Sequence, residues 1–164
     1  MNFQNYFKNK IALITGSGRG IGLEIAKEYL KHGAKVIAID LNTKRLLNLR
    51  NKHRNNILIK KFDLSNLDNF NSFLKKLPKN FQNINILINN AGMKSAENLV
   101  KTDINNLNNL INFNSIKVIE ISRILINFSL KKNKGRIINI GSSLSSHGAV
   151  FRAQGGGSDY SVTK

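Results

Sequence analysis

Short apolar runs alternate along the chain with longer stretches in which apolar and polar residues are mixed. Each run is rich in Ile or Val and is bounded by Gly, Asn or Asp. The runs lie at residues 11–15, 35–40, 57–61, 84–89 and 136–141. Continuous apolar runs of this kind are typical of parallel strands that are buried on both faces of a sheet. The pattern therefore predicts a strand at each run.

The stretches between these runs are amphipathic and predict helices. They cover residues 21–33, 43–54, 65–80 and 103–135. Gly33 stands where a C-terminal helix cap is wanted, and Pro78 marks the end of the third stretch. Alternation of strands and helices predicts an α/β domain with a parallel sheet and right-handed crossovers. We find no internal repeat and no interdomain linker, so we expect residues 1–164 to form a single domain.

Length and composition agree with one globular domain. The chain has 164 residues, and 41% of them are hydrophobic. No apolar run approaches the length that crosses a bilayer, and the first residues lack the pattern of a secretory signal. There is no Cys, which excludes disulfides and Cys-zinc sites, and the three His residues are scattered, so no metal site is expected. We expect a cytoplasmic protein without membrane association.

The chain is strongly basic, with a formal net charge of +17 from 26 basic and 9 acidic residues. One interpretation is a nucleic-acid-binding protein. The other is a genome that favours Lys, Asn and Ile codons. The basic residues are dispersed in pairs, and no motif that reads RNA or DNA accompanies them. We therefore favour the second interpretation, and we expect salt-sensitive adhesion to polyanions but no specific nucleic-acid partner.

A glycine-rich loop follows the first predicted strand and precedes the first predicted helix. It reads TGSGRGIG and covers residues 15–22. Glycines at 16, 20 and 22 allow a sharp turn and a close approach of the backbone to a ligand. The helix N-terminus that follows offers free N–H groups to a pyrophosphate. The alternative is a tight strand-to-helix turn without a ligand, but the position between strand and helix favours a dinucleotide site.

Two acidic residues follow the second and third predicted strands. A carboxylate at Asp40 can accept both hydroxyls of an adenosine ribose and would repel a 2′-phosphate, which favours NAD over NADP. Arg19 in the loop, with Lys44 and Arg45 beyond the second strand, could instead attract that phosphate, so NADP stays possible. Asp63 could reach the adenine edge, or it could cap a helix that begins near residue 65.

Three motifs in order now point to a family. TGSGRGIG is followed by NNAG at 89–92 and by YSVTK at 160–164. In this order they resemble the classical short-chain dehydrogenases/reductases, from Lys10 to Lys164. The resemblance implies a Rossmann-like, doubly wound parallel sheet with strand order 3-2-1-4-5 and helices on both faces. It also implies a nicotinamide cofactor, NAD or NADP, and a small-molecule carbonyl or alcohol substrate.

The resemblance also implies the residues of the site. Ile21 would pack beneath the dinucleotide, Asp63 and Leu64 would flank the adenine, and Asn90 would tie neighbouring strands together. The implied cofactor-binding residues are Gly16, Ser17, Arg19, Gly20, Ile21, Gly22, Asp40, Asp63, Leu64, Asn90, Ala91, Gly92, Tyr160 and Lys164. The implied catalytic residues are Asn114, Ser142, Tyr160 and Lys164, with Asn112 and Ser143 as the alternatives for the first two.

The implied chemistry is a hydride transfer coupled to a proton transfer. An unperturbed phenol has a pKa near 10, so Tyr160 needs help to act as general acid/base. Lys164, one helical turn later, would stabilise the phenolate and lower that pKa. Ser142 would hydrogen-bond the substrate oxygen, and Asn114 would complete a water chain. The segment from Ser142 to Tyr160 is several residues longer than is usual in the family.

Family members continue after the Lys of this motif. We therefore expect a C-terminally truncated chain, a fragment that lacks the later strands and the segment that covers the substrate. We expect these 164 residues by themselves to be inactive as a dehydrogenase. The longer form is expected to be a homo-oligomer. Two further classes of function stay open: a dinucleotide-binding pseudoenzyme without turnover, and a basic nucleic-acid-associated protein.

Overall fold

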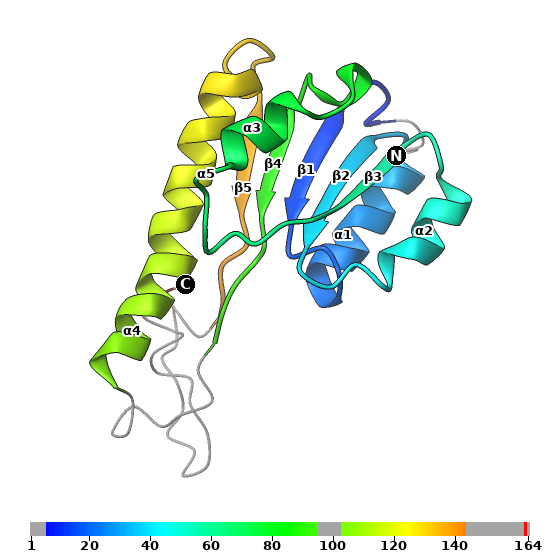
Figure 1. The fold of residues 1–164 in the computed structure, drawn as a ribbon. Coiled ribbons are helices and arrows are strands. Elements are labelled where there is room, and N and C mark those ends of the chain that lie inside the picture. Colours follow the sequence, from blue (N-terminus) through cyan, green and yellow to red (C-terminus); the bar gives the residue numbers. More distant parts are fainter. Residues whose placement is uncertain (1–5, 95–102, 144–162, 164) are drawn as a thin grey trace.

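A computed structural model of the chain describes residues 6–94, 103–143 and 163. Its five parallel strands form one sheet in the order β3-β2-β1-β4-β5, the Rossmann-like order that the resemblance implied (Figure 1). The strands are β1 (Ile11–Thr15), β2 (Lys35–Asp40), β3 (Ile57–Lys61), β4 (Ile86–Asn89) and β5 (Arg136–Asn139). The helices are α1 (Gly20–Lys31), α2 (Leu46–Lys52), α3 (Phe70–Lys75), α4 (Ile104–Ile111) and α5 (Lys117–Leu125), with a short 3-10 helix η1 (Lys79–Phe81).

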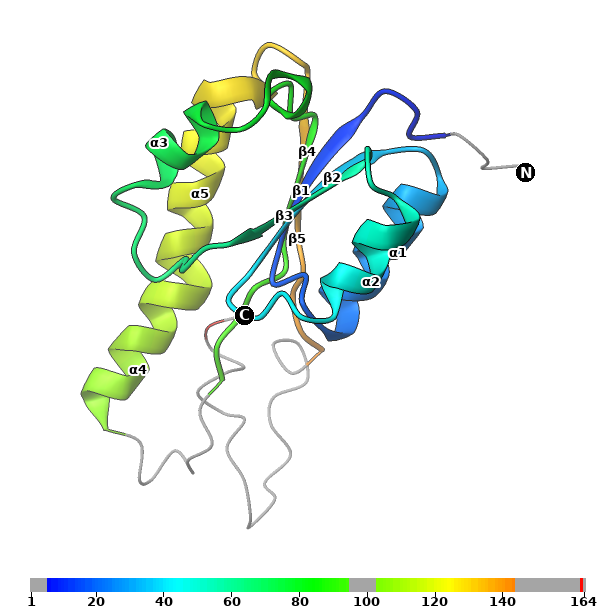
Figure 2. The ribbon, with the colours of Figure 1, turned by 45° about the vertical axis from the view of Figure 1, so that its right-hand side comes forward.

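The sheet is covered by helices on both faces, as Figure 2 shows from its edge. Helices α1 and α2 lie on one face, where Leu23, Ala26 and Leu46 pack against inward residues of β1, β2 and β4. Helices α3 and α5 lie on the other face, where Phe70 and Leu125 are fully buried against the opposite side of the same strands. The predicted doubly wound architecture is thereby confirmed.

The central strands are buried on both faces, and the outer ones are not. Every residue of β1 is buried, whereas every residue of β5 is exposed, including Ile137 at 37% and Ile138 at 40%. The expectation of a fully buried fifth strand is therefore wrong for the part of the chain that the structure describes. In that part β5 is the last strand of the sheet and pairs with β4 alone.

The third predicted helix is shorter than its amphipathic pattern. The pattern covered 65–80, but α3 begins only at Phe70 and ends at Lys75. In the residues before α3, side chains bind backbone N–H groups that a helix would use. Asp63 accepts from Ser65 N, and Asn66 accepts from Asp68 N, both at 2.9 Å. Such local side-chain bonds hold the chain in turns instead of a helix.

The long predicted helix at 103–135 is interrupted by two π-helical segments. Segment η3 (Asn112–Ile116) joins α4 to α5, and segment η4 (Ile126–Leu130) follows α5. Segments of this kind are uncommon inside α-helices and are frequent at functional sites. Within the described residues, no helix is both long enough and apolar enough to span a membrane.

Candidate functional site

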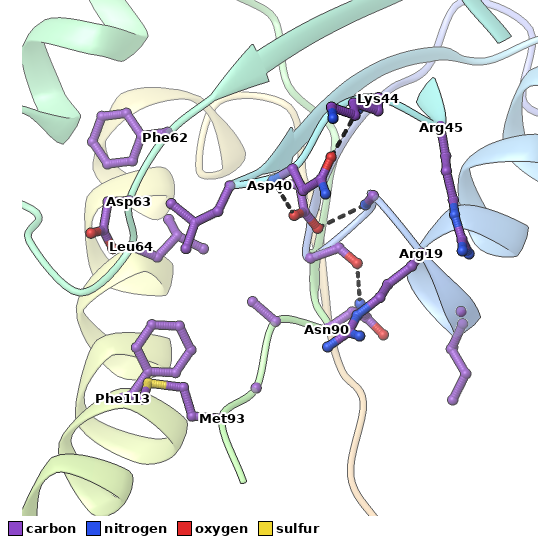
Figure 3. Close-up of a pocket in the computed structure, with 18 residues that line it drawn as sticks. Arg19, Asp40, Lys44, Arg45, Phe62, Asp63, Leu64, Asn90, Met93 and Phe113 are labelled. Atoms are coloured by element: carbon purple, nitrogen blue, oxygen red, sulfur yellow. Dashed lines mark hydrogen bonds between the residues drawn. The ribbon is translucent and has the colours of Figure 1, made fainter. Parts of the chain in front are cut away.

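A cavity of about 850 Å³ opens at the carboxyl ends of β1, β2 and β4 (Figure 3). It lies where the chain turns from the β1-β2 side of the sheet to the β1-β4 side, which is where open α/β sheets bind ligands. Its volume falls within the range of roughly 300–1,000 Å³ that is usual for cofactor sites. The lining residues are Gly16, Gly18, Arg19, Gly20, Ile21, Asp40, Leu41, Asn42, Lys44, Arg45, Phe62, Asp63, Leu64, Asn90, Ala91, Gly92, Met93 and Phe113.

The glycine-rich loop forms the floor of this cavity and leads into α1. Gly16 has φ +64°, and a Cβ there would lie 2.7 Å from the Cα of Ala91. Only glycine satisfies both conditions, so the loop can lie against the end of β4. Arg19 is the extended N-cap residue of α1 and makes no side-chain cap. The first N–H groups of α1 therefore lack side-chain capping at the positive end of the helix dipole.

Two predicted loop residues lie behind the cavity instead of lining it. Ser17 is fully buried, and its hydroxyl donates to the carbonyl of Ile39 at 3.2 Å. Gly22 is buried as well, and a Cβ there would overlap the Gly16 carbonyl. Their contacts support the shape of the loop, and any direct contact of theirs with a cofactor stays a prediction.

Asp40 joins the loops that follow β1 and β2. One of its carboxylate oxygens accepts from Gly18 N and the other accepts from Asn42 N, both at 2.8 Å. A Cβ on Gly18 would lie 2.7 Å from the carboxylate carbon, so this close approach requires glycine. The carboxylate keeps lone pairs for a further donor, because each oxygen can accept more than one hydrogen bond. Asp40 lines the cavity, as do the cationic residues Arg19 and Lys44 (Figure 3).

Asp63 and Leu64 form the wall at the end of β3. Asp63 Oδ1 accepts from Ser65 N at 2.9 Å and from Ser65 Oγ at 2.7 Å. These two bonds, the backbone one first, lower the pKa of the Asp63 carboxyl below its ordinary value. The carboxylate therefore stabilises a turn. The expected helix cap near residue 65 is wrong, because α3 begins only at Phe70. Leu64 is buried and lines the cavity.

The end of β4 is tied to the end of β1 by a small polar network. Asn90 Nδ2 donates to the carbonyls of Thr15 at 3.1 Å and Gly16 at 2.9 Å. In the reverse direction, Thr15 Oγ1 accepts from Asn90 N at 3.0 Å and from Ala91 N at 3.1 Å. The same hydroxyl donates to the carbonyl of Ile88 at 3.3 Å. These contacts fit the strand-tying role that the resemblance implied for Asn90.

Asn114 lies inside η3 and is buried, with 5% of its surface exposed. Its Oδ1 accepts from Met93 N, and its Nδ2 donates to the carbonyl of Met93, both at 2.8 Å. The Asn114 amide thus forms two hydrogen bonds with the backbone of the residue that directly follows the NNAG motif. The alternative residue, Asn112, is exposed. Burial and contacts therefore favour Asn114 over Asn112.

The remaining predicted catalytic residues are only partly described. Ser142 is half-buried and Ser143 is exposed, and both follow β5. Neither lines the cavity, and Ser142, with Ser143 as its alternative, stays a prediction. Tyr160 and Lys164 lie outside the described residues.

Several residues of the site carried no signal in the sequence. Thr15 is buried at the start of the TGSGRGIG motif, but its role depends on partners about seventy-five positions away. Phe113 and Met93 line the cavity because the helix and the β4 loop come together there. Asn42 could have been noticed as a turn residue after β2, since its backbone N–H donates to Asp40 and its side-chain Oδ1 accepts from Lys44 N.

Comparison with known proteins agrees with this geometry. A family model described as short chain dehydrogenase matches residues 10–164. An NADP-dependent 3-hydroxy acid dehydrogenase of Escherichia coli is 32% identical over 155 residues, which are 94% of this chain and 60% of that protein. A 3-oxoacyl-(acyl-carrier-protein) reductase of Escherichia coli is 30% identical over 161 residues, which are 96% of this chain and 63% of that protein.

Solved structures give the same result. The closed form of a serine dehydrogenase complexed with NADP+ superposes with a TM-score of 0.81 at 32% identity, over 94% of this chain and 60% of that one. The chain spans 60–63% of the length of the curated relatives described above. Because the family model covers nearly the whole sequence, the chain belongs to the short-chain dehydrogenase family.

Proposed function

We propose that the protein takes part in NAD(P)-dependent oxidation and reduction of a carbonyl or alcohol substrate. The observation that carries the proposal is the cavity itself. A glycine-rich loop, the N-terminus of α1 and the Asp40 carboxylate meet at the point where the strand order reverses. These groups match the pyrophosphate and ribose of a dinucleotide.

The residues that line the cavity fit such a cofactor. Gly16 and Gly20 keep the loop free of side chains, and beyond Gly20 a Cβ would meet nothing within 4 Å. That side of the loop is therefore open, and the N–H groups at the start of α1 are available to an anion. On the opposite wall, Leu64 and Phe62 provide an apolar surface for an adenine ring.

When bound, the nicotinamide group supplies or accepts the hydride. The chain would provide the proton transfer through Tyr160, whose phenol exchanges a proton with the substrate oxygen. Lys164 would lower the pKa of that phenol, and Ser142 would hold the substrate oxygen in place. Asn114 would support the site from behind, because its amide fixes the Met93 backbone at the cavity wall.

Within this function, we propose that NAD is preferred over NADP. The support is Asp40, whose carboxylate is held at the cavity edge by two backbone N–H groups and would repel a 2′-phosphate. NADP is the second candidate, favoured by the neighbouring Arg19, Lys44 and Arg45 and by the NADP dependence of the relatives. The cytoplasmic location and the homo-oligomer belong to the same proposal.

The named relatives also suggest where to look for a substrate. Their names refer to 3-hydroxy acids, 3-oxoacyl groups and serine, which share an oxygen on C3 when the carboxyl or acyl carbon is counted as C1. We therefore place 3-hydroxy and 3-oxo acids and their thioesters first in a panel of alcohols and ketones.

The test follows nicotinamide absorbance with the purified protein across this panel, with NAD(H) and NADP(H) in parallel. Saturable cofactor binding is the expected result for the 164 residues by themselves, and cofactor-dependent turnover is expected of a form that spans the full length of the relatives. Saturable cofactor binding by the full-length form without any turnover would instead support the pseudoenzyme class. An absence of both would contradict the proposal.

A further inference from the structure

Asn114 makes a third hydrogen bond in addition to the two that it makes with the Met93 backbone. Besides the two bonds to the Met93 backbone, its Nδ2 donates to Thr163 Oγ1 at 2.8 Å. The side-chain amide offers two donors and one carbonyl acceptor, and all of these groups are engaged in the three bonds. Asn114 therefore joins two segments that are about seventy positions apart in the sequence.

Thr163 is held at a second point by the next residue of the same π-helical segment. Ser115 Oγ donates to the carbonyl of Thr163 at 3.2 Å, so consecutive residues of η3 bind both its hydroxyl and its backbone. Thr163 is buried, with 4% of its surface exposed. A polar side chain that is buried to this degree loses free energy unless it is hydrogen-bonded, which makes the pairing with Asn114 specific.

Thr163 belongs to the motif that contains two of the predicted catalytic residues. It lies directly before Lys164 and three residues after Tyr160, inside the YSVTK motif. Adjacent Cα atoms are about 3.8 Å apart, so anchoring Thr163 restricts where the next residue can lie. The same amide is bonded to Met93, which lines the cavity. The Asn114 side chain thus connects the YSVTK motif to the wall of the cavity by hydrogen bonds.

We propose that Thr163 is a positioning residue. Its hydroxyl binds Asn114 and thereby fixes the position of the YSVTK motif, so that Tyr160 and Lys164 are held in place relative to the cofactor. The inference rests on the proposed oxidoreductase function for its catalytic consequence. The hydrogen-bonded link itself involves only described residues and can be tested without turnover.

The test compares three variants of the full chain. Thr163→Val keeps the shape and removes the hydroxyl, Thr163→Ser keeps the hydroxyl and removes a methyl group, and Ser115→Ala removes the second anchor. Backbone amide exchange is measured by NMR for residues 163 and 164 and for Met93. We expect exchange of the first two to quicken about fivefold in Thr163→Val, as for the loss of one net hydrogen bond, and to stay near the wild-type rate in Thr163→Ser.

Kinetics provides the second measurement in any preparation that turns over. Thr163→Val is expected to lower kcat roughly tenfold or more, because small misplacements of reacting groups cost large factors in rate. The Kd of the cofactor should stay within about twofold, since the loop and α1 are untouched, and Thr163→Ser should restore kcat. A merely structural role would lower the yield of folded protein and leave kcat per folded molecule unchanged.

The outcomes separate the two proposals. Unchanged exchange in both Thr163→Val and Ser115→Ala would overturn the positioning role, whether or not the protein is an enzyme. Should Thr163→Ser behave like Thr163→Val, the hydroxyl would not be the active group and the inference would be wrong. If the wild-type protein binds no dinucleotide, the proposed function fails, and exchange alone then decides the link. If Thr163→Val does not fold, Ser115→Ala carries the same test.

Discussion

Replacing Thr15 with Val removes a single oxygen atom that serves three hydrogen bonds. Thr15 closes β1 and is only 1% exposed, so its hydroxyl cannot be replaced by solvent without rearrangement. Val has nearly the same shape but lacks the hydroxyl, so the main loss is that of the hydrogen bonds. The change removes hydrogen bonds that connect the end of β1 to the end of β4, directly beneath the cavity.

The size of the effect follows from the partners of that oxygen. Two backbone donors, Asn90 N and Ala91 N, would lose their acceptor, and the Ile88 carbonyl would lose a donor. Asn90 and Ala91 are half-buried, so water can partly compensate, and a cost near 1 kcal/mol per lost bond is appropriate. The free energy of unfolding should therefore fall by about 2–3 kcal/mol. That is a large share of the ~5–15 kcal/mol usual for a domain.

Urea unfolding followed by circular dichroism measures this change. With a slope of about 2 kcal/mol/M, the midpoint should fall by roughly 1–1.5 M. Thr15→Ser is the matched control, because it keeps the oxygen and loses one methyl group, and it should lie closer to the wild-type protein than Thr15→Val does. A midpoint for Thr15→Val within about 0.3 M of wild type, at unchanged slope, would refute the reasoning.

The remaining predictions concern the cofactor, the proton and a turn. Asp40→Ala should weaken NAD binding and relax discrimination against NADP in a titration with both cofactors; tighter NADP than NAD binding by the unmodified protein would remove the preference. In a full-length form, Tyr160→Phe should abolish turnover and leave cofactor Kd nearly intact, and a substantial residual rate would exclude Tyr160 as the acid/base. The Asp63 carboxyl should titrate below its ordinary pKa by NMR, and Ser65→Ala should move it only part of the way back, because the backbone bond persists. Since this pKa is lowered on folding, the stabilisation it brings exists at neutral pH and is lost as the pH falls through the folded-state pKa.

The strands were predictable because their signal is local. The apolar runs at 11–15, 35–40 and 57–61 coincide with β1, β2 and β3. Each run is contiguous and ends at residues that break a strand, so its limits can be read without tertiary information. The same holds for Gly33, whose φ of +87° ends α1 as its position after the helix predicted.

The site depended on contacts between distant segments, and these were predictable only through the family motifs. The acceptor role of Thr15 and the link from Asn114 to Thr163 bring together residues separated by about fifty to seventy-five positions. A π-helical segment such as η3 also leaves no mark in the apolar pattern, because it preserves an amphipathic helix on average. For Asp63, the sequence allowed an adenine contact or a helix cap. Its bonds to Ser65 form a turn before α3, and the adenine contact stays a prediction.

The central claim is that the cavity at the ends of β1, β2 and β4 binds a nicotinamide dinucleotide. Titration of the isotope-labelled protein with NADH, followed by amide chemical shifts, tests it most directly. We predict saturable shifts at Gly16, Gly18, Asn42 and Ala91, which line the cavity. We predict little change on α3, none of whose residues lines the cavity. Shifts that do not saturate, or that gather away from the cavity, would contradict the claim.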